Sequence, residues 1–254
     1  MTGFEDIHGR DESWAVRDRR RHSSTVRTMF ARIAGVYDFM NHLLSLNRDK
    51  AWRRRVAALV DADAGEVLDL CAGTGDLALE IMRAGRGRAW IAADFCPEML
   101  VGARGKRGAD RLALAAADAM ALPLQAASVD AVTVGFGVRN FADVKLGVAE
   151  IARVLRPGGQ LLVLDFFRDD PRGTGQAKGV ALPLRWLLNT LVPFLGRLVG
   201  RDGSAYSYLS HSMGAFMTPR EFADLLEADG FSDAFVQRQT FGIAHIVGAR
   251  RRSE

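Results

Sequence analysis

The sequence predicts an α/β protein built around a mostly parallel sheet of seven strands. Short apolar runs alternate with segments of helical periodicity from Val67 to Phe166. A glycine-rich turn follows the first of these runs, and two further strand-like runs lie near the end of the chain. Such alternation is typical of βαβ units, in which successive strands pair in parallel.

Each strand is predicted from a short apolar run, and each helix from apolar residues three and four positions apart. In chain order the predicted strands are Glu66 to Cys71, Arg88 to Asp94, Leu112 to Ala117, Val129 to Phe136, Gln160 to Phe166, Asp233 to Thr240 and Ile243 to Ala249. The helices predicted between the first five strands are Asp76 to Ala84, Pro97 to Arg107 and Asp143 to Val154.

Two local signals punctuate the second half of the chain. The segment Arg156-Pro157-Gly158-Gly159 predicts a helix stop followed by a turn into the fifth strand. Further on, Thr218 is placed as an N-cap, Pro219 as the first helical residue and Glu221 as the partner in a capping box. Gly230 closes that helix.

The chain before the sheet divides into two parts. Residues 1–24 are polar and charged without an apolar period, which predicts a flexible arm. From Met29 to Val60 apolar residues return at helical spacing, which predicts two or three helices. We expect residues 25–254 to form a single domain.

An apolar insertion, residues 171–217, precedes the last helix and strands. Its longest uncharged run, Trp186 to Gly196, has 11 residues, whereas a membrane span needs about 20. The insertion is therefore not expected to cross a membrane. The insertion is expected to be either a buried helix or a lid that covers a lipophilic substrate and contacts the bilayer surface.

Composition places the chain among soluble globular proteins. With 48% hydrophobic and 25% charged residues it is neither disordered nor a multi-span membrane protein. Two cysteines are too few for a disulfide framework and suit a reducing cytosol, and no metal-ligand spacing occurs. A binding module that uses the net charge of +4 on nucleic acid or anionic lipid is an alternative, but no nucleic-acid-binding motif supports it.

The glycine-rich turn points to a nucleotide-containing ligand. Gly73 and Gly75, with Thr74 between them, let a ligand approach the backbone closely. The segment Gly73 to Ala78 satisfies the G-x-G-x-x-A pattern of dinucleotide sites, and Asp94 lies 21 residues past the first glycine, where an acidic residue binds ribose hydroxyls. An NAD-dependent dehydrogenase is therefore one hypothesis.

Charge favours a different cofactor. Asp69, four residues before Gly73, is expected to face the same cleft. Two like charges about 4 Å apart repel by about 4 kcal/mol at an effective dielectric of about 20, which disfavours a pyrophosphate. S-adenosylmethionine carries an ammonium, a sulfonium and a ribose diol but no phosphate. Asp118 and Ala119 follow the third strand, and we expect them to contact the adenine of this cofactor. For Asp69, the alternative to a cofactor contact is that its carboxylate only caps the following turn.

Several segments narrow the assignment. Beyond the glycine loop they are Tyr37-Asp38-Phe39-Met40-Asn41, Trp52-Arg53-Arg54, Phe136-Gly137-Val138-Arg139-Asn140, Arg153-Val154-Leu155-Arg156-Pro157-Gly158-Gly159 and Tyr206-Ser207-Tyr208-Leu209. Together they resemble the UbiE/MenG family over about Met29 to Ala249. These enzymes C-methylate the quinol ring in menaquinone and ubiquinone biosynthesis. The resemblance implies the Rossmann-like fold of class I S-adenosylmethionine-dependent methyltransferases.

The sequence departs from the family pattern at three places. Asn47 stands where glycine is usual, Asp165-Phe166-Phe167 replaces Glu-Phe-Ser, and Gly135 occupies a position beside the cofactor that is often serine. The first two bear on substrate positioning and the third on cofactor contact. None removes a group that methyl transfer requires.

The resemblance also implies the catalytic residues. Guanidinium stays protonated in proteins, so Arg139 is assigned to stabilise a developing phenolate or to orient a water that takes the proton. Its alternative is an ion pair with Asp143 or another carboxylate. Asn140 binds the ring oxygen or holds the turn, and Tyr37 completes the proton path, positions the ring or simply packs.

The same resemblance implies the partners. The implied substrate is a polyprenyl quinol, and demethylmenaquinol is the favoured one. We expect its binding pocket to be lined by Tyr206, Tyr208 and His211. We expect a cytoplasmic enzyme that associates peripherally with the inner face of the membrane and binds no nucleic acid. A homodimer is compatible with this expectation. A methyltransferase for another lipophilic molecule, such as a sterol, polyketide or phospholipid, is the alternative enzyme.

Overall fold

The computed structural model describes residues 23–168 and 216–253. Most of the predicted arm and nearly all of the predicted insertion lie outside the described residues, and so do Tyr206, Tyr208 and His211. Within the described part, no helix is long and apolar enough to cross a membrane.

Seven strands form one sheet in the order β3-β2-β1-β4-β5-β7-β6. They are β1 (Glu66–Leu70), β2 (Ala89–Asp94), β3 (Leu112–Ala116), β4 (Val129–Gly135), β5 (Leu155–Asp165), β6 (Phe231–Gln239) and β7 (Ala244–Arg251). The pairs from β3 to β5 are parallel, and β7 alone runs antiparallel, between β5 and β6. The predicted mostly parallel sheet is confirmed, with strand ends within a few residues except at β5.

The start of β5 corrects the prediction of a separate turn at Arg156 to Gly159. Leu155 already pairs with Val129, so the strand begins directly after the preceding helix. The register then skips, because Ala131 pairs with Gln160, and Gly158 adopts a positive φ of 77° within the irregular stretch. The proline and glycines thus make a bulge inside the strand rather than a turn before it.

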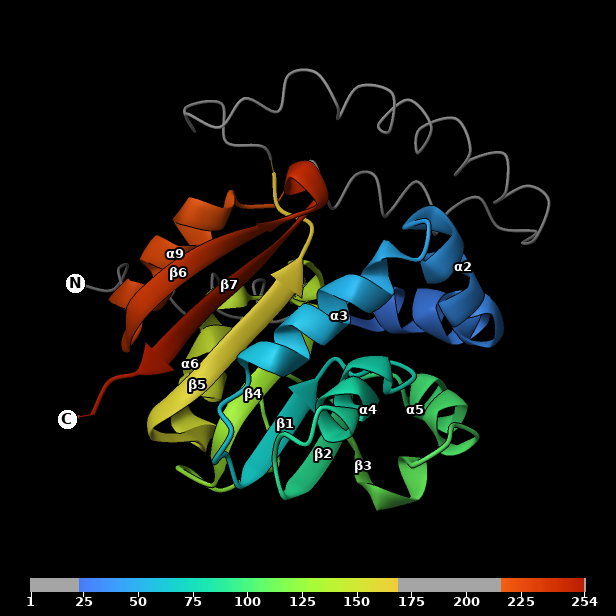
Figure 1. The fold of residues 1–254 in the computed structure, drawn as a ribbon, viewed down its shortest axis with the longest axis horizontal. Helices are drawn as coiled ribbons and strands as arrows, with labels where there is room; N and C mark the ends of the chain where they lie inside the picture. Colours follow the sequence, from blue (N-terminus) through green and yellow to red (C-terminus); the bar gives the residue numbers. More distant parts are fainter. Residues whose placement is uncertain (1–22, 169–215, 254) are drawn as a thin grey trace, which may run out of the picture.

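Helices cover both faces of the sheet (Figure 1). After residues 23–33, which are helical, and a short turn come α2 (Tyr37–Leu44) and α3 (Arg48–Leu59), which confirm the predicted N-terminal helices. The others are α4 (Asp76–Arg83), α5 (Pro97–Arg104), α6 (Val144–Val154) and α9 (Pro219–Ala228). The capping box of Thr218 and Glu221 opens α9 as predicted, with both reciprocal hydrogen bonds formed.

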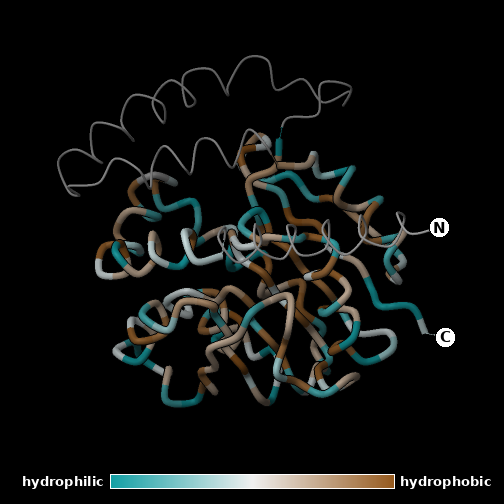
Figure 2. The backbone as a smooth tube through the Cα atoms, turned by 180° about the vertical axis from the view of Figure 1, so that it is seen from behind, coloured by the Kyte–Doolittle hydropathy of each residue, from teal (hydrophilic) through white to brown (hydrophobic). Residues whose placement is uncertain are grey.

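Two apolar cores lie on either side of the sheet, because successive strand residues point to opposite faces. Leu161 and Val163 of β5 join the core beneath α6 and α9, whereas Leu162 and Leu164 join the core beneath α3 and α4. Figure 2 shows the apolar stretches of the chain concentrated in the interior along these strands. Strands buried on both faces explain why they read as nearly continuous apolar runs.

The carboxyl ends of the parallel strands meet at one edge of the sheet. Register places Asp94 of β2 beside Ala116 of β3, and Gly135 of β4 beside Leu164 of β5. Helix α2 lies above this edge (Figure 1). Open α/β sheets bind ligands at this edge, where strand order reverses between β1 and β4.

Candidate active site

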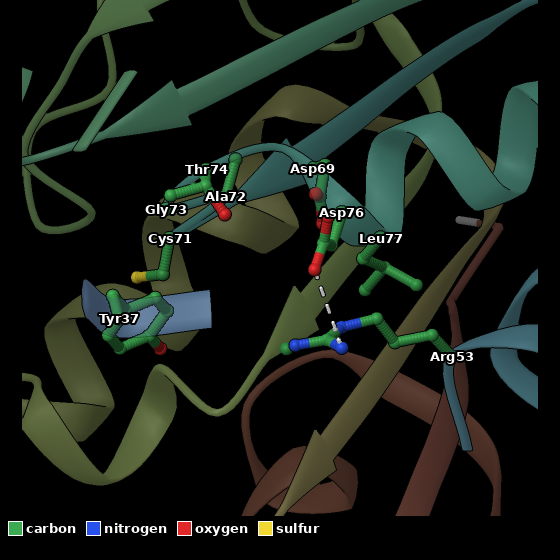
Figure 3. A pocket seen from close by; sticks show the side chains of 10 residues that line it. Tyr37, Arg53, Asp69, Cys71, Ala72, Gly73, Thr74, Asp76 and Leu77 are labelled. Carbon is green, nitrogen blue, oxygen red and sulfur yellow. Dashed lines mark ion pairs between the residues drawn. The ribbon is translucent and has the colours of Figure 1, made fainter. Parts of the chain in front are cut away.

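The loop from Cys71 to Gly75 joins β1 to α4, and its residues Cys71 to Thr74 line a pocket, whereas the predicted cofactor residue Gly75 does not (Figure 3). Gly73 has a φ of 56°, a left-handed conformation that glycine adopts at little cost. A Cβ at Gly73 would make only ordinary van der Waals contacts, 3.4 Å from Met99 Cε and 3.6 Å from Tyr37 Cε1. Glycine is therefore favoured here by the backbone conformation rather than by lack of space.

Asp94 ends β2 beside this loop and is held in a fixed orientation. Its Oδ2 accepts the backbone N–H of Gly73 at 2.8 Å, and its Oδ1 accepts that of Cys96 at 2.8 Å. Burial raises the pKa of Asp94, and these two hydrogen bonds oppose the rise. Each oxygen retains a lone pair for a further donor, so the carboxylate fits a ribose diol.

Asp69 lies at the pocket, as predicted, and also has the alternative role of capping the following helix. It lines the pocket, but its side chain is buried, with Oδ2 accepting Ala78 N–H at 3.0 Å and Oδ1 accepting the Thr133 hydroxyl at 2.7 Å. The carboxyl thus caps the start of α4. Burial raises the pKa of Asp69 to about 7, so this carboxyl carries only part of a negative charge near neutral pH.

The titration of Asp69 predicts a pH-dependent affinity for S-adenosylmethionine. The carboxyl ionises as pH rises through about 7, and only the ionised form attracts the cationic cofactor. We expect binding to tighten about three- to tenfold between pH 6 and pH 8, measured by calorimetric titration. Asp69→Asn is expected to flatten the profile. An equally steep profile in Asp69→Asn would assign the effect to another group, such as Asp94.

Asp118 and Ala119 follow β3 next to Asp94. The backbone N–H of Ala117 donates to the Asp94 carbonyl at 3.0 Å, which brings this turn to the pocket edge of the sheet. Asp118 Oδ1 accepts Met120 N–H at 2.9 Å, and Ala119 is buried. The position matches the predicted adenine end of the cofactor, and the adenine contact itself stays a prediction.

Gly135, at the end of β4, also lines the pocket. A Cβ there would lie 3.2 Å from Leu77 Cδ2, so a side chain is accommodated only if Leu77 yields. Its position beside the glycine loop agrees with the predicted cofactor contact.

Arg139 lies in a 3-10 turn (Val138–Asn140) directly after β4 and is paired with Asp165, the last residue of β5. Its Nη1 donates to Asp165 Oδ1 at 2.5 Å and to the Phe136 carbonyl at 2.8 Å. The partner is therefore Asp165 and not Asp143, which caps α6 through Leu146 N–H.

The ion pair between Arg139 and Asp165 is almost inaccessible to solvent. The Arg139 side chain is 6% exposed and that of Asp165 is fully buried. Asp165 Oδ2 also accepts the Arg139 backbone N–H at 3.3 Å, whereas Arg139 Nε has no hydrogen-bond partner among the described residues. Sequence reasoning noted Asp165 only as a departure from the family pattern and did not identify it as the partner.

The other two predicted catalytic residues lie on different elements, Asn140 in the same turn as Arg139 and Tyr37 at the start of α2. Asn140 donates from Nδ2 to the Phe136 carbonyl at 3.4 Å, a contact that supports its turn-holding role. Tyr37 of α2 lines the pocket below Cys71 (Figure 3). Burial raises the pKa of Tyr37, while a hydrogen bond with Asn41 and the charge of Arg139 lower it, so the phenol keeps its proton at neutral pH.

One residue to which the sequence analysis gave no role in the site, Arg53, lies on the α3 side of the pocket. Arg53 pairs with Asp76 at 3.6 Å (Figure 3). It also pairs with Asp49. Its guanidinium carbon lies 5.8 Å from the centroid of the Phe136 ring. Asn47, which precedes α3, has a φ of 59°, a left-handed conformation that asparagine tolerates and glycine prefers.

Solved structures share this fold. A chain of the complex between the Haloferax volcanii Trm112 methyltransferase activator and a methyltransferase aligns with a TM-score of 0.63 at 17% identity, covering 88% of this chain and 98% of its own. A SAM-dependent methyltransferase from Aquifex aeolicus aligns with a TM-score of 0.54 at 16% identity, covering 83% and 92%. The sheet order and the glycine loop with Asp94 define a class I S-adenosylmethionine-dependent methyltransferase.

Sequence comparison specifies the family. A model of the ubiE/COQ5 methyltransferase family matches residues 16–250. A demethylmenaquinone methyltransferase of Deinococcus radiodurans is 41% identical over 240 residues, covering 93% of this chain and 97% of that protein. One from Thermus thermophilus is 42% identical over 226 residues, covering 87% and 100%. The chain belongs to the ubiE/COQ5 methyltransferase family, as its motifs predicted, and its cofactor is S-adenosylmethionine.

Proposed function

We propose that this enzyme methylates the ring carbon of a polyprenylated naphthoquinol, converting demethylmenaquinol to menaquinol. The names of the Deinococcus and Thermus relatives support a naphthoquinol, whereas a UbiE relative from Geobacter sulfurreducens, 36% identical over 227 residues, is named for both ubiquinone and menaquinone biosynthesis. The observation that carries the proposal is Arg139, a buried guanidinium at the carboxyl edge of the sheet whose Nε has no described partner.

Different residues around the pocket bind the cofactor and promote methyl transfer. Bound S-adenosylmethionine supplies an electrophilic methyl group. Asp94 orients the ribose, and the glycine loop admits the cofactor to the backbone. The quinol is the reactive form because its ring carbon is electron-rich, and it must lose the proton of that carbon after the new C–C bond has formed. Holding the reacting carbon in line is itself worth several powers of ten in rate.

Arg139 stabilises the phenolate that develops on the ring. A permanently protonated guanidinium cannot act as the base, but its N–H groups donate to an oxyanion. Asp165 fixes the guanidinium, and the protonated Tyr37 phenol supplies a second donor on the opposite, α2 side of the pocket. The quinol hydroxyl loses its proton to a water that these groups orient, which leaves the phenolate that Arg139 stabilises. After the ring carbon has taken the methyl group, its own proton leaves to water as the ring becomes aromatic again.

A transfer assay tests the proposal. Purified enzyme is incubated with S-adenosylmethionine carrying a labelled methyl and with either demethylmenaquinol or 2-methoxy-6-polyprenyl-benzoquinol, each in reduced and oxidised form. We expect label on the ring carbon of the reduced naphthoquinol, none on the oxidised ring, and at least a hundredfold loss in Arg139→Ala with cofactor binding retained. Label on neither quinol, with the cofactor still bound, would redirect the search to another lipophilic acceptor.

We further propose that the reaction takes place at a membrane surface, where the polyprenyl tail of the quinol resides. We expect the enzyme to associate peripherally with the inner face of the membrane, since the polyprenyl chain partitions into lipid at about 25 cal/mol per Å² of buried apolar surface. The exposed side chains of Phe39 and Leu46, 59% and 55% exposed and placed in and just after α2, support this site of contact. Flotation with liposomes that contain the quinol, compared between wild type and Phe39→Ser, measures it.

A further inference from the structure

Lys106 joins three elements at the edge of the cofactor pocket. The chain contains 34 lysines and arginines, of which only four are lysines, and Lys106 is one of them. It lies in the turn after α5, where its Nζ reaches Asp38 Oδ2 at 2.6 Å, Asp76 Oδ1 at 2.5 Å and Thr74 Oγ1 at 2.9 Å. These acceptors belong to α2, to the start of α4 and to the glycine loop.

The three contacts match the chemistry of an ammonium group. Lysine has three N–H donors in a tetrahedral arrangement and no acceptor, so one donor serves each of the three oxygens. Thr74 in turn donates its hydroxyl to Asp38 Oδ1 at 2.5 Å, which closes the network. An arginine fork is planar and longer, and it cannot direct three donors to acceptors on three sides.

The network links α2 to the pocket. Asp38 follows Tyr37 in α2, and Tyr37 forms part of the pocket wall opposite Gly73. Thr74 and Asp76 line the same pocket. Lys106 therefore ties the wall that carries Tyr37 to the loop that receives the cofactor.

Without the Lys106 ammonium, the carboxylates of Asp38 and Asp76 would repel each other. Asp38 and Asp76 both contact Nζ, so removal of the ammonium leaves two carboxylates facing each other from α2 and α4. Arg53, at 3.6 Å from Asp76, is already engaged by Asp49. The partial burial of Lys106, whose side chain is 23% exposed, limits the solvent screening that weakens surface pairs.

We propose that Lys106 is a positioning residue that holds α2 closed over the bound cofactor and thereby sets how long cofactor and product stay in the pocket. Such closure is the usual role of segments that exclude water from a reaction. The inference rests on the proposed function only in that S-adenosylmethionine occupies the glycine-loop pocket.

The test compares Lys106→Arg and Lys106→Met with Lys145→Arg, a control at an exposed lysine on α6. Dissociation of S-adenosylhomocysteine is followed by stopped flow, and hydrogen exchange of α2 is measured with the product bound. We expect release to quicken at least tenfold in both Lys106 variants, faster exchange confined to α2, and no change in Lys145→Arg. Asp38→Asn added to Lys106→Met is expected to recover part of the loss by removing the repulsion.

Two outcomes overturn the inference. Release rates within twofold of wild type would show that α2 closes without Lys106, and exchange raised throughout the sheet would show general destabilisation instead of a local tie. If the wild-type protein itself fails to bind S-adenosylhomocysteine, the proposed function fails, and that result is separate from both outcomes.

Discussion

Asp165→Asn is expected to lower the rate of methyl transfer at least a hundredfold and to cost about 3–5 kcal/mol of unfolding free energy. Asp165 is fully buried, and it supplies the carboxylate that pairs with Arg139. Its Oδ1 accepts Arg139 Nη1 and Phe166 N–H, and its Oδ2 accepts Arg139 N–H. An amide in either orientation therefore turns N–H groups toward a donor and leaves a buried guanidinium without its counter-charge.

Single-turnover methyl transfer and chemical denaturation measure the two effects separately. Asp165→Glu keeps the charge and is expected to retain more activity than Asp165→Asn. In the double variant Asp165→Asn with Arg139→Met no unpaired charge remains, so stability is expected to recover while methyl transfer stays lost. A turnover rate for Asp165→Asn within threefold of wild type would exclude Asp165 as the residue that positions Arg139.

Gly137→Ala is expected to cost about 1–3 kcal/mol of stability and about a hundredfold in turnover. A Cβ at Gly137 would lie 2.5 Å from Cys71 Cβ and 2.8 Å from Cys71 Sγ, closer than atoms can approach. The turn that carries Arg139 must then move away from the glycine loop. A displacement of about 1 Å at a catalytic group is enough for a loss of this size.

A compensating change tests this steric explanation. Cys71 has a φ of 56°, which glycine adopts readily, so Cys71→Gly removes the opposing side chain without backbone strain. The double variant Gly137→Ala with Cys71→Gly is expected to regain most of the turnover and stability, read from the same assay and a thermal melt. If the double variant stays as impaired as Gly137→Ala, the contact with Cys71 is not the cause.

Local sequence patterns were enough to predict the secondary-structure elements and the fold of this protein. Strands buried on both faces, the glycine loop at Gly73 and the capping box at Thr218 each depend on neighbouring residues, and the structure confirms each of them. The family likewise followed from short motifs, because each motif is a run of neighbouring residues.

The partners of the site residues were decided by the tertiary structure. Sequence analysis gave Asp69 a full charge in the cleft, but only the packing of β1 against α4 and Thr133 shows that its carboxyl is buried and titrates near neutral pH. Arg139 meets Asp165 across 26 residues because the parallel register of β4 and β5 aligns their carboxyl ends.

Lys106 shows the same division. Its contact with Thr74 spans 32 residues and that of Thr74 with Asp38 spans 36, and no periodicity in the sequence links these positions. The sequence by itself determined which helices and strands form, because their residue patterns are local. It also determined the family of the chain, because the family motifs are short runs of residues. Which buried charges neutralise one another was decided only when strand register and helix packing brought distant side chains within hydrogen-bonding distance.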